Sequence, residues 1–361
     1  MSGKRSIFED VGEGEAPKAA PTGGMIDARP RGARRAIRAW LMVLFALVVV
    51  MIAVGGLTRL TDSGLSITEW KPVTGALPPM SEAAWEEELE KYRQIPEYQL
   101  QNKGMSMSEF KRIYWWEWGH RQLGRVIGLV WAVGFAGFLV ARKIPVGWSG
   151  RLLMLGVLGG AQGAIGWWMV SSGLQGEMLD VASYRLATHL GLAFVILGFI
   201  AWYVMLLGRE ERDLMQARRA GEAKLFGLAT GWLHFAFLQI LIGALVAGID
   251  AGRSFTDWPL MAGGLLPPDM WMSDLGWRNL FENPGLVQFI HRMVGYALLA
   301  FGVMVWIKGR RSANRATGAA FSAAMIALLA QVVLGIATVL YIAPWQIAIV
   351  HQFVAVVLWV L

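Results

Sequence analysis

Eight apolar segments recur along the 361-residue chain, and each is long enough to cross a lipid bilayer. A membrane-spanning helix needs about 20 predominantly apolar residues. The composition agrees, because 55% of the residues are hydrophobic and 16% are charged, against about 25% charged in soluble domains. The sequence therefore predicts an all-α polytopic membrane protein. Its expected spans are 40–58, 117–140, 151–171, 186–207, 225–249, 287–307, 318–342 and 345–361.

Basic residues cluster in alternate loops, and this pattern predicts the orientation of the spans. Lys and Arg are enriched on the cytoplasmic side of a membrane, so both ends of the chain are expected to be cytoplasmic. The long loops 59–112 and 250–284 are then expected outside. The formal charge of +7 is interpreted as topology and not as nucleic-acid binding. The basic clusters are Arg31, Arg34, Arg35 and Arg38, then Arg142, Lys143 and Arg151, then Arg209, Arg212, Arg218, Arg219 and Lys224, then Lys308, Arg310, Arg311 and Arg315.

The two ends of the sequence carry weaker signals. No cleavable signal peptide opens the chain, and residues 1–24 mix acidic residues with Gly and Pro, which predicts disorder. The same acids argue against a mitochondrial transit peptide. The last span reaches Leu361 without a closing basic cluster, which leaves open a natural chain that continues beyond it.

The chain repeats itself. Gly-Leu-Ser-Ile-Thr-Glu-Trp (64–70), after the first span, returns after the fifth as Gly-Arg-Ser-Phe-Thr-Asp-Trp (252–258), and both copies run on to a Pro-Pro pair. Each half holds an even number of spans, so the halves share one orientation. The expected architecture is two tandem four-helix bundles. The expected divisions are a disordered cytoplasmic N-terminus at 1–35, an N-terminal bundle at 36–210 and a C-terminal bundle at 211–361.

A further helix is expected in the first outer loop. It would start at Ser81, with Trp85, Leu89 and Tyr92 on one face at helical spacing. Such a helix could lie on the membrane surface or roof a pocket.

Four histidines indicate the chemistry. His120, His189, His291 and His351 fall one in each even-numbered span, within about two turns of the expected outer end. Two histidines at equal depth on facing helices suit haem ligation, and the repeat supplies two such pairs. An ionisable side chain inside a bilayer is costly and is by default functional. The sequence contains no Cys, which excludes thiolate ligation, disulfides and iron–sulfur clusters.

The surroundings of these histidines are also patterned. The residue four positions later is small in all four cases, which would leave room for a flat macrocycle against the helix. The fifth histidine, His234, lies in an odd-numbered span and lacks this pattern, so a structural role is expected for it. The small residues are Gly124, Ala193, Gly295 and Ala355.

Glu117 distinguishes the two halves. It precedes His120 by three positions and so faces the same pocket, whereas the equivalent residue before His291 is Gln288. We hypothesise that the N-terminal pocket reacts and the C-terminal pocket holds a fixed cofactor. The alternative for Glu117 is an ordinary ion pair with Arg121, four positions later.

Arginines and glutamines complete the pattern. Arg121 and Arg292 occupy equivalent places in the two halves and, with Arg125, are candidates for pairing haem propionates. Spans three, five and seven share a Gln-x-x-x-Gly motif, interpreted as helix packing and not as chemistry. The motifs are Gln162 with Gly166, Gln239 with Gly243, and Gln331 with Gly335.

Taken together, the paired His-Arg-x-x-Gly segments, Glu117 and the Gly-x-Ser-x-Thr-acid-Trp loops resemble the haem A synthase family, in its proteobacterial and mitochondrial branch. The resemblance covers about 36–361. It implies oxidation of a methyl group of haem O to a formyl group by successive hydroxylations, giving haem A for cytochrome oxidase. It also implies that His120 and His189 flank the substrate haem O, that Glu117 is catalytic, and that His291 and His351 are axial ligands of a permanent haem b.

The resemblance further implies a location in the bacterial inner membrane and partners besides haem O and lipid. These are an electron donor or acceptor of unspecified identity, the enzyme that makes haem O, and assembly factors of cytochrome oxidase. Some Gram-positive relatives carry a Cys pair in the outer loops, so any step that depends on that pair cannot operate here.

Three other functions remain compatible with the residues. A di-haem b-type electron-transfer cytochrome would explain four histidines but not the Glu117 and Gln288 difference. A transporter built from parallel repeats could use the histidines as a proton relay. A haem chaperone for oxidase assembly would differ from the enzyme only in turnover.

Overall fold

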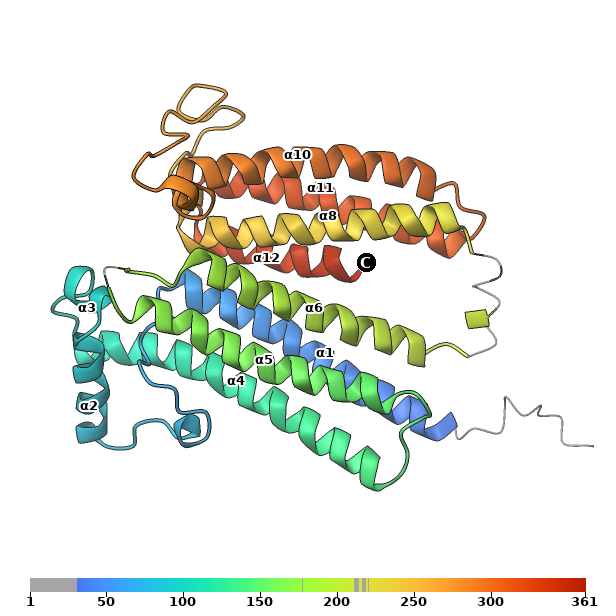
Figure 1. Ribbon diagram of the computed structural model, residues 1–361, viewed down its shortest axis with the longest axis horizontal. Coiled ribbons are helices and arrows are strands. Elements are labelled where there is room, and N and C mark those ends of the chain that lie inside the picture. Colours follow the sequence, from blue (N-terminus) through green and yellow to red (C-terminus); the bar gives the residue numbers. More distant parts are fainter. Residues whose placement is uncertain (1–30, 177, 211–213, 216–218, 220) are drawn as a thin grey trace, which may run out of the picture.

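The structure is a computed structural model that describes residues 31–361 except 177, 211–213, 216–218 and 220 (Figure 1). The described residues form long helices joined by loops and short helical turns. The long helices are α1 (Arg31–Leu60), α4 (Met107–Val140), α5 (Ser149–Gly173), α6 (Ser183–Leu207), α8 (Ala223–Gly248), α10 (Pro284–Gly309), α11 (Arg315–Leu340) and α12 (Trp345–Val360). The short ones are η1 (Thr74–Ala76), α2 (Glu82–Arg93), α3 (Pro96–Leu100), η2 (Ala251–Arg253), η3 (Gly276–Arg278) and α9 (Asn279–Glu282).

The predicted spans are confirmed as helices. Seven described helices are long and apolar enough to cross a membrane, and α12 is a shorter apolar helix in the place of the eighth. Some boundaries differ from the prediction, since α1 begins at Arg31 and α4 at Met107. Residues 31–35 are therefore helical, which corrects the end of the N-terminal segment predicted to be disordered. Residues 1–30 of that segment lie outside the described part of the chain.

The long helices pack as two rings of four. In the first ring, α1 and α5 each contact both α4 and α6. In the second ring, α10 contacts α8 and α11, and α12 contacts α8 and α11. Figure 1 shows the two rings side by side, with α6 and α8 along the boundary. This arrangement places the helices of the two halves as the repeat requires, because each loop motif follows the first helix of its ring.

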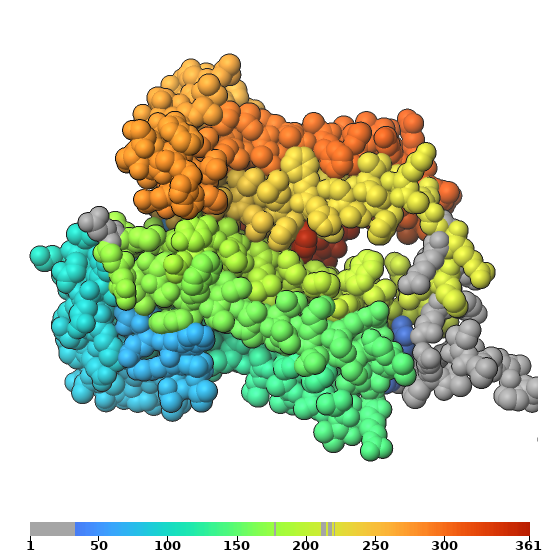
Figure 2. Space-filling model, viewed as in Figure 1, coloured from blue at the N-terminus to red at the C-terminus, as the bar shows by residue number. Residues whose placement is uncertain are grey.

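Specific polar contacts join the two rings. Gln352 on α12 donates to the carbonyl oxygen of Ile52 on α1 at 2.7 Å. Gly56 makes this approach feasible, since a Cβ built there would lie 2.3 Å from Oε1 of Gln352. Trp359 donates to the carbonyl oxygen of Phe194 on α6, also at 2.7 Å. In the space-filling view, α12 is visible at the floor of a hollow between α6 and α8 (Figure 2).

The outer-loop helix predicted from Ser81 is confirmed as α2. The Ser81 side chain accepts a hydrogen bond from the amide of Ala84, which caps the helix, and Trp85, Leu89 and Tyr92 are buried. These apolar side chains pack against the first turns of α4, which is why α4 continues beyond the predicted span. Figure 1 places α2, α3 and the loop before α10 at the same end of the helices.

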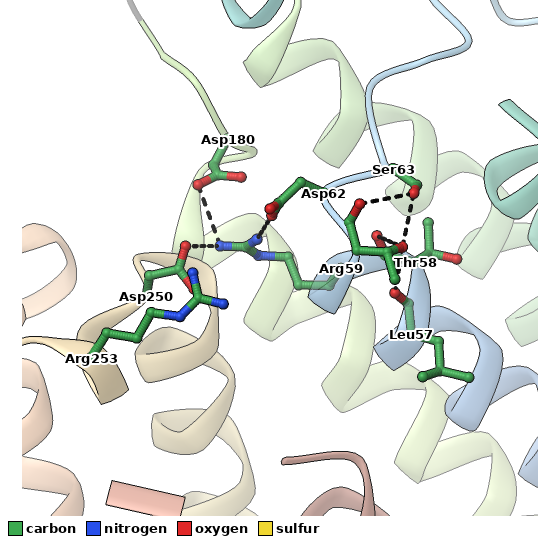
Figure 3. Close-up of polar contacts among 9 residues, drawn as sticks. Leu57, Thr58, Arg59, Asp62, Ser63, Asp180, Asp250 and Arg253 are labelled. Carbon is green, nitrogen blue, oxygen red and sulfur yellow. Dashed lines mark hydrogen bonds and ion pairs between the residues drawn. The ribbon is translucent and has the colours of Figure 1, made fainter. Parts of the chain in front are cut away.

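Arg59 connects the two halves at this end (Figure 3). Its guanidinium lies 3.0 Å from Asp62, 3.3 Å from Asp180 and 3.0 Å from Asp250. Asp250 follows α8, so one cation at the end of α1 binds carboxylates from both rings. Arg59 is mostly buried, with 14% of its side chain exposed, so its charge depends on these carboxylates more than that of a surface arginine does.

Candidate functional site

The four paired histidines lie on the helices that correspond to the even-numbered spans, one on each of α4, α6, α10 and α12. Counted from the helix start, His189, His291 and His351 fall within the first two turns, as expected. His120 does not, because α4 begins at Met107 and continues outward beyond the ring to pack against α2. The depth predicted for His120 relative to its helix start is therefore wrong.

The structure brings the histidines together in the predicted pairs. The rings of His120 and His189 are near enough to interact electrostatically, and so are those of His291 and His351. Nδ1 of His189 and of His351 is buried and has no hydrogen-bond partner among the described residues. Each pair thus presents imidazoles whose hydrogen-bonding capacity the protein leaves partly unused.

The composition of each pair indicates which kind of metal group could bind. Among the described residues, no group of three or more His, Cys, Asp and Glu side chains could hold a metal ion. Two imidazoles supply only two ligands, so an iron bound between them must bring its other ligands with it. A haem does so, because its porphyrin supplies four equatorial nitrogens and the protein supplies axial histidines. The residues present therefore fit a haem in each half.

The Gln-x-x-x-Gly motifs contact these histidines, which the packing interpretation missed. Nε2 of Gln162 donates to the carbonyl oxygen of His189 at 2.9 Å. Gln239 binds the carbonyl oxygen of His291 at 3.0 Å, and Gln331 that of His351 at 3.0 Å. The signal was present in the sequence, because each motif lies in the span directly before a histidine-bearing one.

The glycine of each motif lies against the imidazole ring. A Cβ built on Gly166 would lie 2.8 Å from Cε1 of His189, closer than real contacts allow. The corresponding distance to Cε1 is 3.1 Å for Gly243 and His291, and 3.3 Å for Gly335 and His351. The missing side chain thus provides the space in which each ring stands.

The small residues four positions after the histidines serve the same helix contacts. A Cβ built on Gly295 would lie 3.2 Å from Nε2 of Gln239, and one built on Gly124 would lie 3.5 Å from Cε of Met51. Side chains of the preceding helix occupy the space beside both glycines. At Gly124 and Gly295 a side chain of the preceding helix thus lies beside the glycine, and room for a macrocycle at these positions stays a prediction.

Glu117 is buried, with 2% of its surface exposed, and all its bonds go to Arg121 and the first outer loop. Oε2 accepts from the Ile67 amide at 2.7 Å and from the Ser66 hydroxyl at 2.8 Å. Oε1 accepts from Arg121 Nη2 at 2.6 Å and from Nε at 3.0 Å. The ion pair considered as an alternative is thus present, and it does not exclude a second role for the carboxylate.

The C-terminal half repeats this arrangement with an amide. Gln288 and Arg292 both donate to the carbonyl oxygen of Phe255 at 3.0 Å, the position equivalent to Ile67. Oε1 of Gln288 is buried and has no partner among the described residues. The loop is therefore held in both halves, but only the N-terminal half does so with a negative charge.

The candidate propionate arginines hold outer-loop backbone in this structure. Besides Glu117, Arg121 binds the carbonyl oxygens of Ile67 and Glu69, at 2.8 and 3.0 Å. Arg292 binds that of Leu260 at 2.9 Å, and Arg125 binds two more, at 2.8 and 2.9 Å. A pocket of about 270 Å³ lies beside Arg121 and Arg125, with α2 forming part of its wall.

Glu97, on α3, is a buried carboxyl that the sequence did not single out. Only 3% of its surface is exposed, and its Oε2 has no partner among the described residues. Burial, together with the negative charges of Asp180, Glu117 and Asp62, raises the pKa of Glu97 to about 8. We call α2, α3 and the loops beside them the outer cap. It therefore contains a carboxyl whose pKa lies above neutral pH.

His234 is exposed on α8, away from both pairs. Its Nδ1 lies 2.7 Å from the carbonyl oxygen of Thr230 on the same helix. The ring is thus hydrogen-bonded within its own helix, and its role stays a prediction.

The fold and the site define a class: a helical membrane protein with two similar rings of helices, each presenting a pair of histidines. The chain belongs to the cytochrome oxidase assembly protein family (COX15-CtaA), which matches residues 38–361. Proteins named heme A synthase are similar to it over nearly their whole length. The one from Ruegeria pomeroyi is 71% identical over 100% of this chain and 95% of its own. Those from Roseobacter denitrificans and Paracoccus denitrificans are 66% and 62% identical, covering 95% and 94% of the relatives.

Proposed function

We propose that this chain is an oxidoreductase that converts haem O to haem A in the course of cytochrome oxidase assembly. One methyl group of the porphyrin is oxidised to a formyl group through successive hydroxylations. The observation that supports the proposal most directly is the combination of two histidine pairs with a buried carboxylate, Glu117, in only one half. A pure electron carrier has no evident need for that difference.

In the proposal, the two halves have different tasks. His120 and His189 hold the substrate haem O, and His291 and His351 hold a permanent haem b that relays electrons. When bound, that haem would supply one-electron chemistry. The lipid-embedded N-terminal ring would solvate the long isoprenoid tail of haem O without exposing it to water.

The surrounding polar residues are assigned to binding and proton transfer. With water as the source of oxygen and an external electron acceptor as the oxidant, oxidation of a methyl to a formyl group releases protons, and Glu117 lies one helical turn from His120. Its carboxylate, already held by Arg121 and the loop of Ser66 and Ile67, is fixed in place to accept one. The haem propionates are assigned to Arg121, Arg125 and Arg292. To bind a propionate, each arginine would give up hydrogen bonds to main-chain carbonyl oxygens.

The orientation belongs to the proposal as well. The pattern of basic loops supports a topology in which both termini lie in the cytoplasm of a bacterial inner membrane and the outer cap lies on the opposite side. Figure 1 shows the two long loops at one common end, so both lie on the same side in this topology.

The test is expression of the full chain in a host that makes haem O but no haem A. Haems extracted from the purified protein are resolved by reversed-phase chromatography. We expect haem A from the parent, and haem O without haem A from Glu117→Gln. Haem b alone, without haem O or haem A, would instead indicate an electron-transfer cytochrome.

A further inference from the structure

Three of the four histidine-bearing helices are fastened to the preceding helix in the same way. A glutamine amide donates to the main-chain carbonyl of the histidine, at 2.9 Å for Gln162 and 3.0 Å for Gln239 and Gln331. The amide of Gln239 also lies 3.1 Å from Nδ1 of His291, and that of Gln162 lies 3.4 Å from Nε2 of His189. Each glutamine thus contacts the proposed ligand residue itself.

These three sites also share unused polar atoms. Oε1 of Gln162, Gln239 and Gln331 is buried and has no partner among the described residues. Nδ1 of His189 and of His351 is buried and unpartnered as well. A histidine that binds a metal through Nε2 carries its proton on Nδ1, and that N–H normally donates to a nearby acceptor. An amide oxygen is an acceptor of this kind, and at His189 and His351 both the glutamine Oε1 and the histidine Nδ1 are left without a partner among the described residues.

The fourth site differs in one residue. On α1, Met51 and Gly55 stand before His120 as Gln239 and Gly243 stand before His291. The comparison is spatial as well, because Met51 approaches Gly124 as Gln239 approaches Gly295. A thioether has no hydrogen to donate and is a weak acceptor, so Met51 cannot make the bonds of a glutamine.

The ring of His120 also stands differently. A Cβ built on Gly55 would meet Nε2 of His120 at 3.1 Å and Cδ2 at 3.5 Å. At the other three sites the nearest ring atom to the glycine is Cε1. The one histidine without a glutamine is therefore the one whose ring is turned relative to its neighbouring glycine.

We propose that Gln162, Gln239 and Gln331 are positioning residues that hold three axial histidines through their main-chain carbonyl oxygens, and that Met51 leaves His120 as the exchangeable ligand. The inference rests on the proposed haem ligation, and it adds which of the four histidines can leave the iron. Removing a partner of this kind typically weakens metal binding about 10- to 100-fold. The N-terminal site would then hold its haem firmly from one side only, through His189.

The difference allows the two sites to carry out different tasks with identical ligands. A haem held by two fastened histidines offers no open position, which suits electron transfer. A haem with one unfastened histidine can accept an external ligand when that histidine turns away. The difference between the reactive half and the fixed half would thus come from Met51 on α1, a helix that carries none of the four histidines.

Carbon monoxide binding to the reduced, haem-loaded protein tests the inference, because CO occupies only a coordination position that a histidine vacates. We expect about half of the bound haem in the parent to bind CO. Met51→Gln should slow CO binding or weaken it about tenfold or more, and Met51→Leu should match the parent. Gln239→Met or Gln331→Met should open the second haem, so that nearly all of the haem binds CO.

The haem-to-protein ratio accompanies each measurement, and it separates two kinds of failure. Protein that binds no haem in any variant would overturn the proposed haem ligation and this inference with it. Two haems bound, with the same CO behaviour in Met51→Gln and the parent, would overturn the inference alone. If Met51→Gln does not fold, the Gln239→Met and Gln331→Met arms decide, since a second haem that stays closed to CO contradicts the role of the glutamines.

Discussion

Glu117 and Gln288 stand at equivalent positions on α4 and α10 and hold equivalent loops, yet with opposite hydrogen-bonding roles. Glu117 accepts from the amide of Ile67, whereas Gln288 donates to the carbonyl oxygen of Phe255. The arginine one turn later binds the equivalent carbonyl oxygen in both halves. The comparison shows that loop anchoring needs only a polar side chain here, so the charge of Glu117 is not explained by anchoring alone.

The largest expected effect separates charge from anchoring. Glu117→Gln should lower haem A formation at least about 100-fold while both haems remain bound, because general acid–base catalysis commonly contributes that much. Ser66→Ala removes one loop bond without changing the charge and should cost far less. Haem A formed per bound haem is the measurement, and an active Glu117→Gln enzyme would leave the carboxylate with a structural role only.

The next effect concerns the space that the motif glycines leave for the imidazole rings. Gly166→Ala places a methyl group 2.8 Å from Cε1 of His189, so haem retention in the N-terminal half should fall about tenfold. Gly163→Ala, on the same helix with nothing within 4 Å, is the matched control. Haem content after detergent washing measures the difference. Equal losses from the two variants would show that the contact is not specific.

A smaller effect is expected where the halves meet. Arg59→Ala leaves Asp62, Asp180 and Asp250 without their shared cation, which should lower the free energy of unfolding by about 1–2 kcal/mol. Asp250→Asn should cost less, because it removes one of three partners. Thermal unfolding in detergent provides the measurement. A variant as stable as the parent would mean that packing alone joins the rings.

A fourth expected effect is a pH dependence from Glu97. Its pKa is about 8 in the folded protein, against an ordinary 4.5, so the folded state binds the proton more tightly. Stability should therefore fall as pH rises from about 4.5 to 8 and level off above that. Glu97→Gln should flatten this slope, and Asp180, whose pKa burial also raises, should maintain part of it.

For the Glu97 experiment, Glu90→Gln is the control, because Glu90 is largely exposed beside Arg93 on the same outer cap. Melting temperatures between pH 5 and 8 compare the variants with the parent. A slope that survives unchanged in Glu97→Gln would assign the pH dependence to other groups.

The sequence predicted the spans, the repeat and the histidine pairing because bilayer physics leaves few alternatives. Apolar runs of a given length must be helices in lipid, and buried histidines there require partners. The start of α4 was missed, since its outer turns gain their burial from α2 and not from lipid. Periodicity along one helix cannot show such a contact.

The role of the glutamines could be predicted only in part. Their spacing was visible, but a hydrogen bond from Gln331 to the main chain of His351 joins two helices whose register only the fold determines. The residue equivalent to them, Met51, was harder to recognise because it breaks the motif. The side chains of Met51 and Gln239 beside Gly124 and Gly295 were not predictable for the same reason.

The contact between α1 and α12 has a consequence for biosynthesis. A chain inserted from its N-terminus completes α1 long before α12 is made, and its parts begin to fold in that order. Until Gln352 reaches Ile52 beside Gly56, the face of α1 behind His120 remains open to lipid or to an insertion factor. The face of the first ring that α12 covers is therefore completed only when the last described helix is in place.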